Sequence, residues 1–190
     1  MSSSPPSIGT PPASEGILSR LPKAGKFLTF GLGDQRFGVP IGIVREINRV
    51  STITPVPQTL DFVVGVINLR GKVIPVVDLR LKLGVPAITF TRSTCIIVLE
   101  ITASQVGIIV DSVKEVTDFA QNNIDPPPTL TASPRASTGD VQSATVFTGL
   151  PAVCGIGKED ERMTLLLDLE DALAPDRLIK KSDEDKNRAA

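Results

Sequence analysis

The stretch from residue 65 to residue 83, GVINLRGKVIPVVDLRLKL, constrains the fold more than any other part of the chain. Two apolar runs rich in β-branched residues flank a charged interruption, Arg70, Gly71 and Lys72, which is the pattern of two buried strands joined by a tight turn. Gly71 can adopt the positive φ that such a turn often requires. The sequence therefore predicts a β-hairpin with Arg70 at its tip.

Arg70 is the first candidate binding residue in the chain. An arginine held at the end of a rigid hairpin can pair with a carboxylate through two parallel hydrogen bonds, and its planar guanidinium also stacks. The alternative is an ordinary solvated turn residue, because arginine prefers the protein surface. The hairpin taken by itself does not decide between these two interpretations.

Other short apolar runs have the alternation and composition of β-strands, and Gly and Pro separate them. Almost no long amphipathic helix interrupts these runs, so the sequence predicts an all-β fold of small barrels or a sandwich. Outside the hairpin, strands are predicted at 27–32, 36–39, 93–101, 105–110, 113–116, 146–149 and 162–169.

Three short helical turns are predicted between the strands. Ile43 and Ile47 lie four residues apart, as on one helix face, so residues 40–47 predict one turn. Leu79, Leu81 and Leu83 alternate as on a strand, but Asp78 can cap a second helical turn that Gly84 closes, and the turn is favoured. Residues 169–173 predict the third.

The ends of the chain and one internal segment have a different composition. Residues 1–25 are rich in Ser, Pro and Gly, so they predict a disordered arm. Residues 125–145 lack periodicity and predict a mobile loop, and residues 175–190 predict a charged, solvated tail. A folded domain is expected between these limits, from residue 26 to residue 174.

The composition excludes several classes of chemistry. The chain has no histidine, so neither an imidazole acid or base nor an imidazole metal site can form within it. It also lacks phosphate-binding and dinucleotide-binding glycine motifs and a CxxC pair. We therefore predict no catalytic activity and no cofactor or metal.

Charge and aromatic content argue against nucleic acid as a partner. There are 20 basic and 21 acidic residues, Trp and Tyr are absent, and Phe occurs seven times. Phosphate neutralisation and base stacking are thus poorly supplied. A small nucleic-acid-binding β-barrel remains a rival interpretation only because such barrels share the short-strand pattern.

The two cysteines and the apolar runs indicate the compartment. Cys95 and Cys154 lie far apart, and Cys95 sits in the apolar run TCIIVL, so both are expected to be buried, reduced thiols. The first 25 residues lack the apolar core of a secretory leader, and no apolar run is long enough for a bilayer. These features predict a cytoplasmic protein without direct membrane insertion.

Four blocks of sequence, taken in order, resemble the CheW family of bacterial chemotaxis coupling proteins. The resemblance spans about residues 25–174, and the ordered set is more specific than any one block. It is carried by FLTFGLGDQRFGVPIGIVREI (27–47), FVVGVINLRGKVIPVVDLRLKLG (62–84), IIVLEITASQVGIIVDSVKEV (96–116) and GKEDERMTLLLDLEDAL (157–173).

The resemblance implies a fold and a role. The implied fold is two intertwined SH3-like five-stranded β-barrel subdomains with short helical turns around a shared hydrophobic seam. The implied role is that of an adaptor without catalysis, which links the histidine kinase CheA, through the kinase's regulatory domain, to the cytoplasmic tip of methyl-accepting chemotaxis receptors. The protein would then be recruited to receptor arrays at the membrane.

The same resemblance assigns protein-binding positions. The VxEI motif falls on residues 44–47 and the INLRG motif on residues 67–71, and two further positions match the receptor-facing groove of the family. The implied protein-binding residues are Val44, Glu46, Gly65, Asn68, Arg70, Gly71 and Val116.

Two features stand apart from the family pattern. The segment 125–148 is longer than the usual family spacing, and its Ser, Thr and Pro content indicates added loop. The arm before residue 26 lies outside the matched region. Within the family, a coupling protein of a chemosensory pathway that controls pili or another output remains an alternative.

Overall fold

A computed structural model describes residues 22–50, 52–86, 88–127, 152–170, 172–173 and 178. Several sequence predictions fall wholly or largely outside these residues. They are the arm over residues 1–25, the loop over 125–145, the strand over 146–149 and the tail over 175–190.

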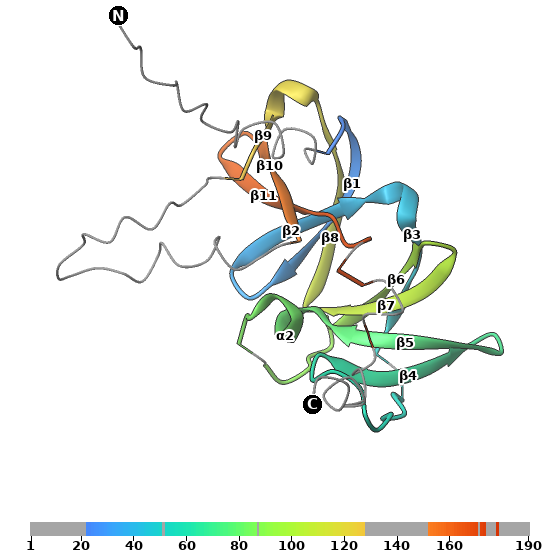
Figure 1. Cartoon of the computed structure of the whole chain (residues 1–190). Helices are drawn as coiled ribbons and strands as arrows, with labels where there is room; N and C mark the ends of the chain where they lie inside the picture. Colours follow the sequence, from blue (N-terminus) through green and yellow to red (C-terminus); the bar gives the residue numbers. More distant parts are fainter. Residues whose placement is uncertain are drawn as a thin grey trace, which may run out of the picture.

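The described chain forms two β-sheets that lie against each other (Figure 1). Two short 3-10 helices and one α-helix accompany them, namely η1 (Ile41–Ile43), η2 (Gln121–Asn123) and α2 (Leu79–Leu83). The six-stranded sheet has the order β8 (Ser112–Phe119), β1 (Gly25–Leu32), β2 (Gln35–Pro40), β11 (Arg162–Leu167), β10 (Val153–Glu159) and β9 (Ile124–Asp125). The five-stranded sheet has the order β3 (Val44–Arg49), β6 (Cys95–Ile101), β7 (Ser104–Val110), β5 (Lys72–Asp78) and β4 (Val63–Leu69).

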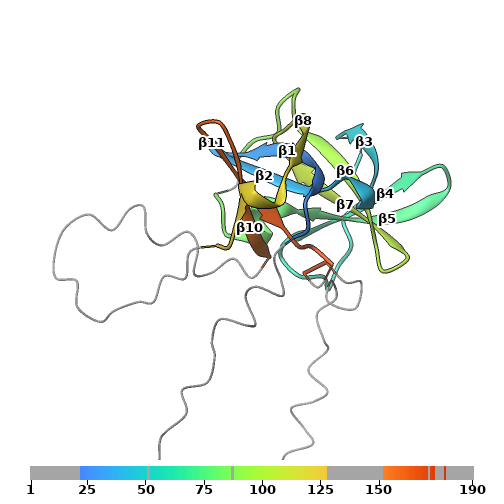
Figure 2. The ribbon, with the colours of Figure 1, turned by 90° about the horizontal axis from the view of Figure 1, so that it is seen from above.

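The two sheets are intertwined along the chain. The five-stranded sheet uses one continuous stretch, from β3 to β7, whereas the six-stranded sheet combines β1 and β2 with the later strands β8 to β11. A parallel pairing between β2 and β11 joins these two parts of the six-stranded sheet. Figure 2 shows the two sheets side by side. The predicted all-β class and paired subdomains are confirmed, with the two-residue β9 as a sixth strand in one sheet.

Each sheet packs apolar side chains on both of its faces. One large core cluster lies between the sheets and takes residues from both, among them Phe30, Phe37, Ile97 and Ile108. A second cluster belongs to the five-stranded sheet and a third to the six-stranded sheet. Burial on both faces explains why strands such as β6 and β7 are continuous apolar runs.

The predicted hairpin around Arg70 forms, and the strands predicted at 93–101 and 105–110 form another. β4 and β5 pair from Val63 to Leu69, and the turn residues Arg70 and Gly71 have φ of 54° and 84°. Positive φ at both central residues matches the twist of the flanking strands. The second hairpin, β6 and β7, has the same kind of turn at Thr102 and Ala103, with φ of 48° and 64°.

The predicted turn after β5 is also present. Asp78 accepts a hydrogen bond from the Arg80 backbone N–H at 2.9 Å and so caps α2, and Gly84 ends the helix with φ of 69°. Leu79 and Leu83 then lie on the buried face. A backbone hydrogen bond from Leu173 N to Leu169 O, 2.9 Å, closes the last predicted turn.

The helical turn predicted over residues 40–47 is largely wrong. Only η1 is helical there, and β3 begins at Val44. Pairing of β3 with β6, from Val44 opposite Leu99 to Arg49 opposite Cys95, outweighs the weak local helical pattern. Ile43 and Ile47 therefore do not share a helix face.

Strand β10 is missing from the sequence prediction. Gly155 and Gly157 interrupt its apolar pattern, and glycine is unfavourable in strands. The structure explains Gly157, because a Cβ added there would lie 2.8 Å from the ring of Phe119. Close packing against that ring therefore requires glycine at this position, and the glycine interrupts the apolar pattern by which a strand is recognised in the sequence.

Candidate functional site

The tip of the β4–β5 hairpin is fixed by its own side chains. The Asn68 side-chain oxygen accepts a hydrogen bond from the Gly71 backbone N–H at 2.9 Å, so Asn68 holds the turn. Arg70 occupies the first central position, and its side chain is 87% exposed. The turn therefore presents a guanidinium to solvent from an ordered backbone.

Glu46 on β3 pairs with this arginine. Arg70 Nη2 lies 3.1 Å from Glu46 Oε2, and the Glu46 side chain is 28% exposed. β3 and β4 are opposite edges of the five-stranded sheet, so this pair joins the two edges where the sheet curls round. The structure thus brings together Glu46, Asn68, Arg70 and Gly71, which we call the hairpin-tip surface.

A second ion pair lies next to this surface. Arg45 Nε donates to Glu100 Oε2 at 2.7 Å, between β3 and β6. The hydrogen bond from Arg45 lowers the pKa of the Glu100 carboxyl, and the same bond raises the pKa of Arg45. Arg45 and Arg70 thus pair with different carboxylates, Glu100 and Glu46.

Val44 and the exposed side chains of β3 complete this edge. Val44 is half-buried and packs against the core between the sheets. Ile47 pairs with Ile97 on β6 and is 46% exposed. Sequence reasoning gave Ile47 to a helix face and so missed it as a candidate contact residue.

Val73 on β5 is a second apolar residue that sequence reasoning placed wrongly. It was expected among the buried strand residues, yet it is 69% exposed. Val73 pairs directly with Asn68, so the two side chains share the outer face of the hairpin. The polar partner across the turn is the signal that could have revealed this exposure.

Gly65 is enclosed by backbone and does not face solvent. It is buried and has φ of 146°, and a Cβ added there would lie 2.2 Å from the Thr54 carbonyl oxygen. Thr54 and Val66 exchange two backbone hydrogen bonds of 2.9 and 2.8 Å beside it. Gly65 thus allows the segment after β3 to lie directly against β4.

Val116 belongs to a different part of the molecule from the hairpin-tip surface. It lies on β8, the edge strand of the six-stranded sheet, and is 48% exposed. The predicted site residues therefore fall on the edge strands of two sheets, with Gly71 and Arg70 at a hairpin tip of one of them.

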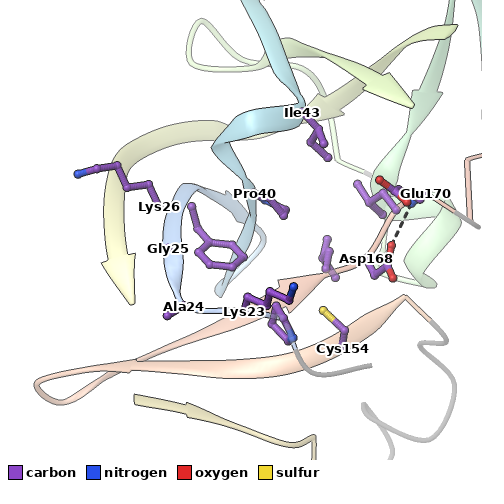
Figure 3. Close-up of a pocket in the computed structure, with 13 residues that line it drawn as sticks. Lys23, Ala24, Gly25, Lys26, Pro40, Ile43, Cys154, Asp168 and Glu170 are labelled. Carbon is purple, nitrogen blue, oxygen red and sulfur yellow. Dashed lines mark hydrogen bonds between the residues drawn. The ribbon is translucent and has the colours of Figure 1, made fainter. Parts of the chain in front are cut away.

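A hollow of about 770 Å³ lies elsewhere, between the start of β1 and the end of β11 (Figure 3). Lys23 and Lys26 line it from the first of these segments, and Asp168 and Glu170 from the second. None of the predicted protein-binding residues lines this hollow.

Cys154 also lines the hollow, and its environment makes it a weak nucleophile. Its Sγ donates to the Leu166 carbonyl oxygen at 3.3 Å. Burial raises the pKa of the Cys154 thiol to about 12, and the charge of Asp168 adds to this effect. Burial likewise raises the pKa of Cys95. Both residues therefore remain thiols at neutral pH.

We expect native-state labelling with a thiol reagent at pH 7 to be slow at both cysteines, since the thiolate is the reactive form. Stability should decrease as the pH rises above about 8.5, the ordinary cysteine pKa, because the unfolded chain then loses protons that the folded chain retains. Labelling of each single-cysteine variant, Cys95→Ala and Cys154→Ala, measures the rates separately. Rapid modification of the folded protein would show that the burial is wrong.

The fold and site together define a class of protein. Two β-sheets share one core, and edge strands and a hairpin tip present paired charges and exposed apolar side chains. Among the described residues, no group of three or more His, Cys, Asp or Glu side chains could hold a metal ion. These features describe a binding module whose function lies in its surfaces.

Comparisons with known proteins identify the family. The CheW-like domain matches residues 26–176. The chain is 33% identical to chemotaxis protein CheW of Klebsiella aerogenes over 153 residues, which cover 80% of this chain and 84% of that one. It is 32% identical to chemotaxis protein CheW of Helicobacter pylori over 151 residues, which cover 80% and 82%.

A solved structure agrees. The crystal structure of the scaffolding protein TtCheW from Thermoanaerobacter tengcongensis matches with a TM-score of 0.67 and 33% identity, and covers 81% of this chain and 95% of that one. The chain belongs to the CheW family. It is a non-catalytic scaffold that couples chemotaxis receptors to the kinase CheA. No helix in the described part of the chain is long and apolar enough to span a membrane.

Proposed function

We propose that the hairpin-tip surface is where this scaffold contacts the regulatory domain of CheA and the cytoplasmic tip of methyl-accepting receptors. The pair between Arg70 and Glu46 is the observation that carries this proposal. Binding energy in protein interfaces concentrates in a few residues, and arginine is enriched among them. An arginine that is exposed yet held by an ordered turn suits that role.

The Arg70 guanidinium can donate further hydrogen bonds to a partner. Its Nη2 donates to Glu46, while a guanidinium has five N–H donors in a planar fork. The pair with Glu46 restricts the side chain before a partner arrives, which lowers the entropy lost on binding. A carboxylate on the receptor or on the kinase can then accept hydrogen bonds from the remaining N–H groups of Arg70.

In the proposal, Val116 supplies an apolar contact and Val44 has a supporting role. Val116 gives the receptor an exposed valine on the β8 edge, and Val44 supports the edge strand that carries Glu46. Gly65 acts indirectly, because its lack of a side chain lets the Thr54 segment reach β4. The protein then reaches the membrane as a cytoplasmic component of receptor arrays, through receptor contacts alone.

We expect Arg70→Ala to weaken association about thirtyfold, or about 2 kcal/mol, if the guanidinium is a central anchor. Folding should hardly change, because exposed ion pairs contribute at most about 1 kcal/mol. Arg70→Lys should not restore full affinity, since an ammonium lacks the planar fork. Calorimetric titration against the receptor fragment and the kinase regulatory domain measures the effect, with melting temperature measured alongside.

A matched control is Arg162→Ala, which removes the arginine that begins β11 on the other sheet. It should leave both affinities unchanged. Unchanged affinities for Arg70→Ala, or a joint collapse of binding and melting temperature, would show that Arg70 is no interface anchor.

Glu46→Gln separates two roles of the carboxylate. If Glu46 only orients Arg70, then Glu46→Gln should have almost no effect in the Arg70→Ala background. If Glu46 also contacts a partner, the double variant should bind more weakly than Arg70→Ala. The double-mutant cycle therefore assigns Glu46 to orientation or to direct contact.

A further inference from the structure

The β8 strand contains an irregularity immediately before Val116. Leu28 on β1 pairs with Val116, but the next pair along is Phe30 with Val113. One residue of β1, Thr29, therefore lies opposite two residues of β8, Lys114 and Glu115. This is a β-bulge, which re-aims the side chains beyond it.

The bulge determines which face Val116 occupies. In a regular strand, residues three apart point to opposite faces. Directly paired residues share a face, so Val113 lies on the face of Phe30 and Val116 on the face of Leu28. Both β1 residues belong to the core cluster between the sheets. The extra residue thus puts Val116 on the same face of the sheet as Leu28 and Phe30, on an edge strand where its side chain is 48% exposed.

The Thr29 hydroxyl replaces the missing backbone partner at the bulge. Thr29 Oγ1 donates to the Glu115 carbonyl oxygen at 2.8 Å and accepts from the Glu115 backbone N–H at 3.3 Å. The Thr29 side chain is fully buried, so no water competes for these bonds at that point. A buried hydroxyl without such partners would be unfavourable.

Arg36 on β2 forms hydrogen bonds with the same residues at the bulge. Its Nη2 donates to Thr29 Oγ1 at 3.0 Å, to Glu115 Oε1 at 2.9 Å and to Thr117 Oγ1 at 3.4 Å. The Arg36 side chain is 17% exposed. It therefore contacts both neighbours of Val116 in sequence, as well as the hydroxyl that fills the bulge.

We infer that Thr29 and Arg36 are positioning residues for receptor binding: they hold the β8 bulge that presents Val116. This inference rests on the proposed receptor contact of Val116. Neither residue reaches the partner itself in this account. Their effect on binding passes entirely through the position of the β8 edge.

Thr29→Val tests the inference, because it keeps the shape of the side chain and removes the hydroxyl. We expect affinity for a receptor cytoplasmic fragment to fall about tenfold, which corresponds to about 1.4 kcal/mol. Affinity for the kinase regulatory domain should stay within about twofold of wild type. Thr29→Ser keeps a hydroxyl and should restore most of the receptor affinity.

Methyl NMR provides a readout that does not depend on a partner. In the wild type, the Val116 and Leu28 methyl groups should show a nuclear Overhauser contact, because directly paired side chains lie close together. We expect Thr29→Val to weaken this contact and Thr29→Ser to keep it. Arg36→Gln provides a second test with the same expected outcome as Thr29→Val, and it applies if Thr29→Val does not fold.

The outcomes separate this inference from the proposed function. An unchanged methyl contact, or equal losses of affinity for both partners, would overturn the positioning role. If Val116→Ser leaves receptor affinity unchanged, Val116 does not contact the receptor, and the proposed effect of Thr29 and Arg36 on receptor binding is wrong as well. The methyl contact would still report in that case whether Thr29 holds the bulge.

Discussion

Gly65→Ala is expected to destabilise the protein by about 3 to 5 kcal/mol, a large share of the total for a domain of this size. The added Cβ would lie 2.2 Å from the Thr54 carbonyl oxygen, and the φ of 146° is one that alanine rarely adopts. Overpacking and backbone strain each contribute to the cost. Urea unfolding monitored by circular dichroism measures the change.

Gly42→Ala is the matched control for this substitution. Gly42 lies in η1, and a Cβ added there meets nothing within 4 Å. Its stability should stay within about 0.5 kcal/mol of wild type. Equal stability of Gly65→Ala and Gly42→Ala would contradict the close approach of the Thr54 segment to β4.

Arg80→Met is expected to cost about 3 kcal/mol, because it leaves the partly buried Asp111 carboxylate, which is 20% exposed, without its charged partner. The Arg80 side chain on α2 is 4% exposed and pairs with Asp111 between β7 and β8. Asp111 also accepts a hydrogen bond from the Gly33 N–H at 2.7 Å. One carboxylate therefore links α2 and the β1–β2 turn to the segment that connects β7 of one sheet with β8 of the other. Urea unfolding of the variant tests this expectation.

A pair on the surface provides the comparison. Lys26 Nζ lies 3.6 Å from Asp118 Oδ2, with both side chains 64% exposed, so Lys26→Met should cost at most about 1 kcal/mol. The double variant Arg80→Met/Asp111→Leu should lose less stability than the sum of the single variants, since neither charge of the pair is then left without its partner. Equal costs for Arg80→Met and Lys26→Met would show that the Arg80 pair is not buried in solution.

The sequence was most informative where local pattern and tertiary packing agree. The β4–β5 hairpin is predicted because turn chemistry and apolar pattern point to the same structure. For α2 the apolar pattern also fits a strand, and capping by Asp78 and closure by Gly84 favour the helix. The prediction failed over residues 40–47, where strand pairing decides the conformation, and at β10, where glycine is required by a neighbouring aromatic ring. Neither cause lies within the segment itself.

The candidate site divides in the same way. Arg70 was placed at an exposed tip from the turn pattern, and its contact with Glu46 joins residues 24 positions apart that only the curled sheet brings together. The exposure of Val73 depends on which hairpin face looks outward, and the burial of Arg80 depends on Asp111 from another strand pair. Long-range register of this kind is not encoded in any short window of sequence.

Reconstitution tests the coupling role most directly. A receptor cytoplasmic fragment assembled on vesicles, the kinase CheA and this protein would be mixed, and kinase cosedimentation and autophosphorylation measured with and without the protein. We predict that the kinase sediments with the receptor and changes its activity only when the wild-type protein is present, and that Arg70→Ala reduces both effects. Kinase sedimentation and activity that are indifferent to the folded wild-type protein would contradict its role as the coupling scaffold.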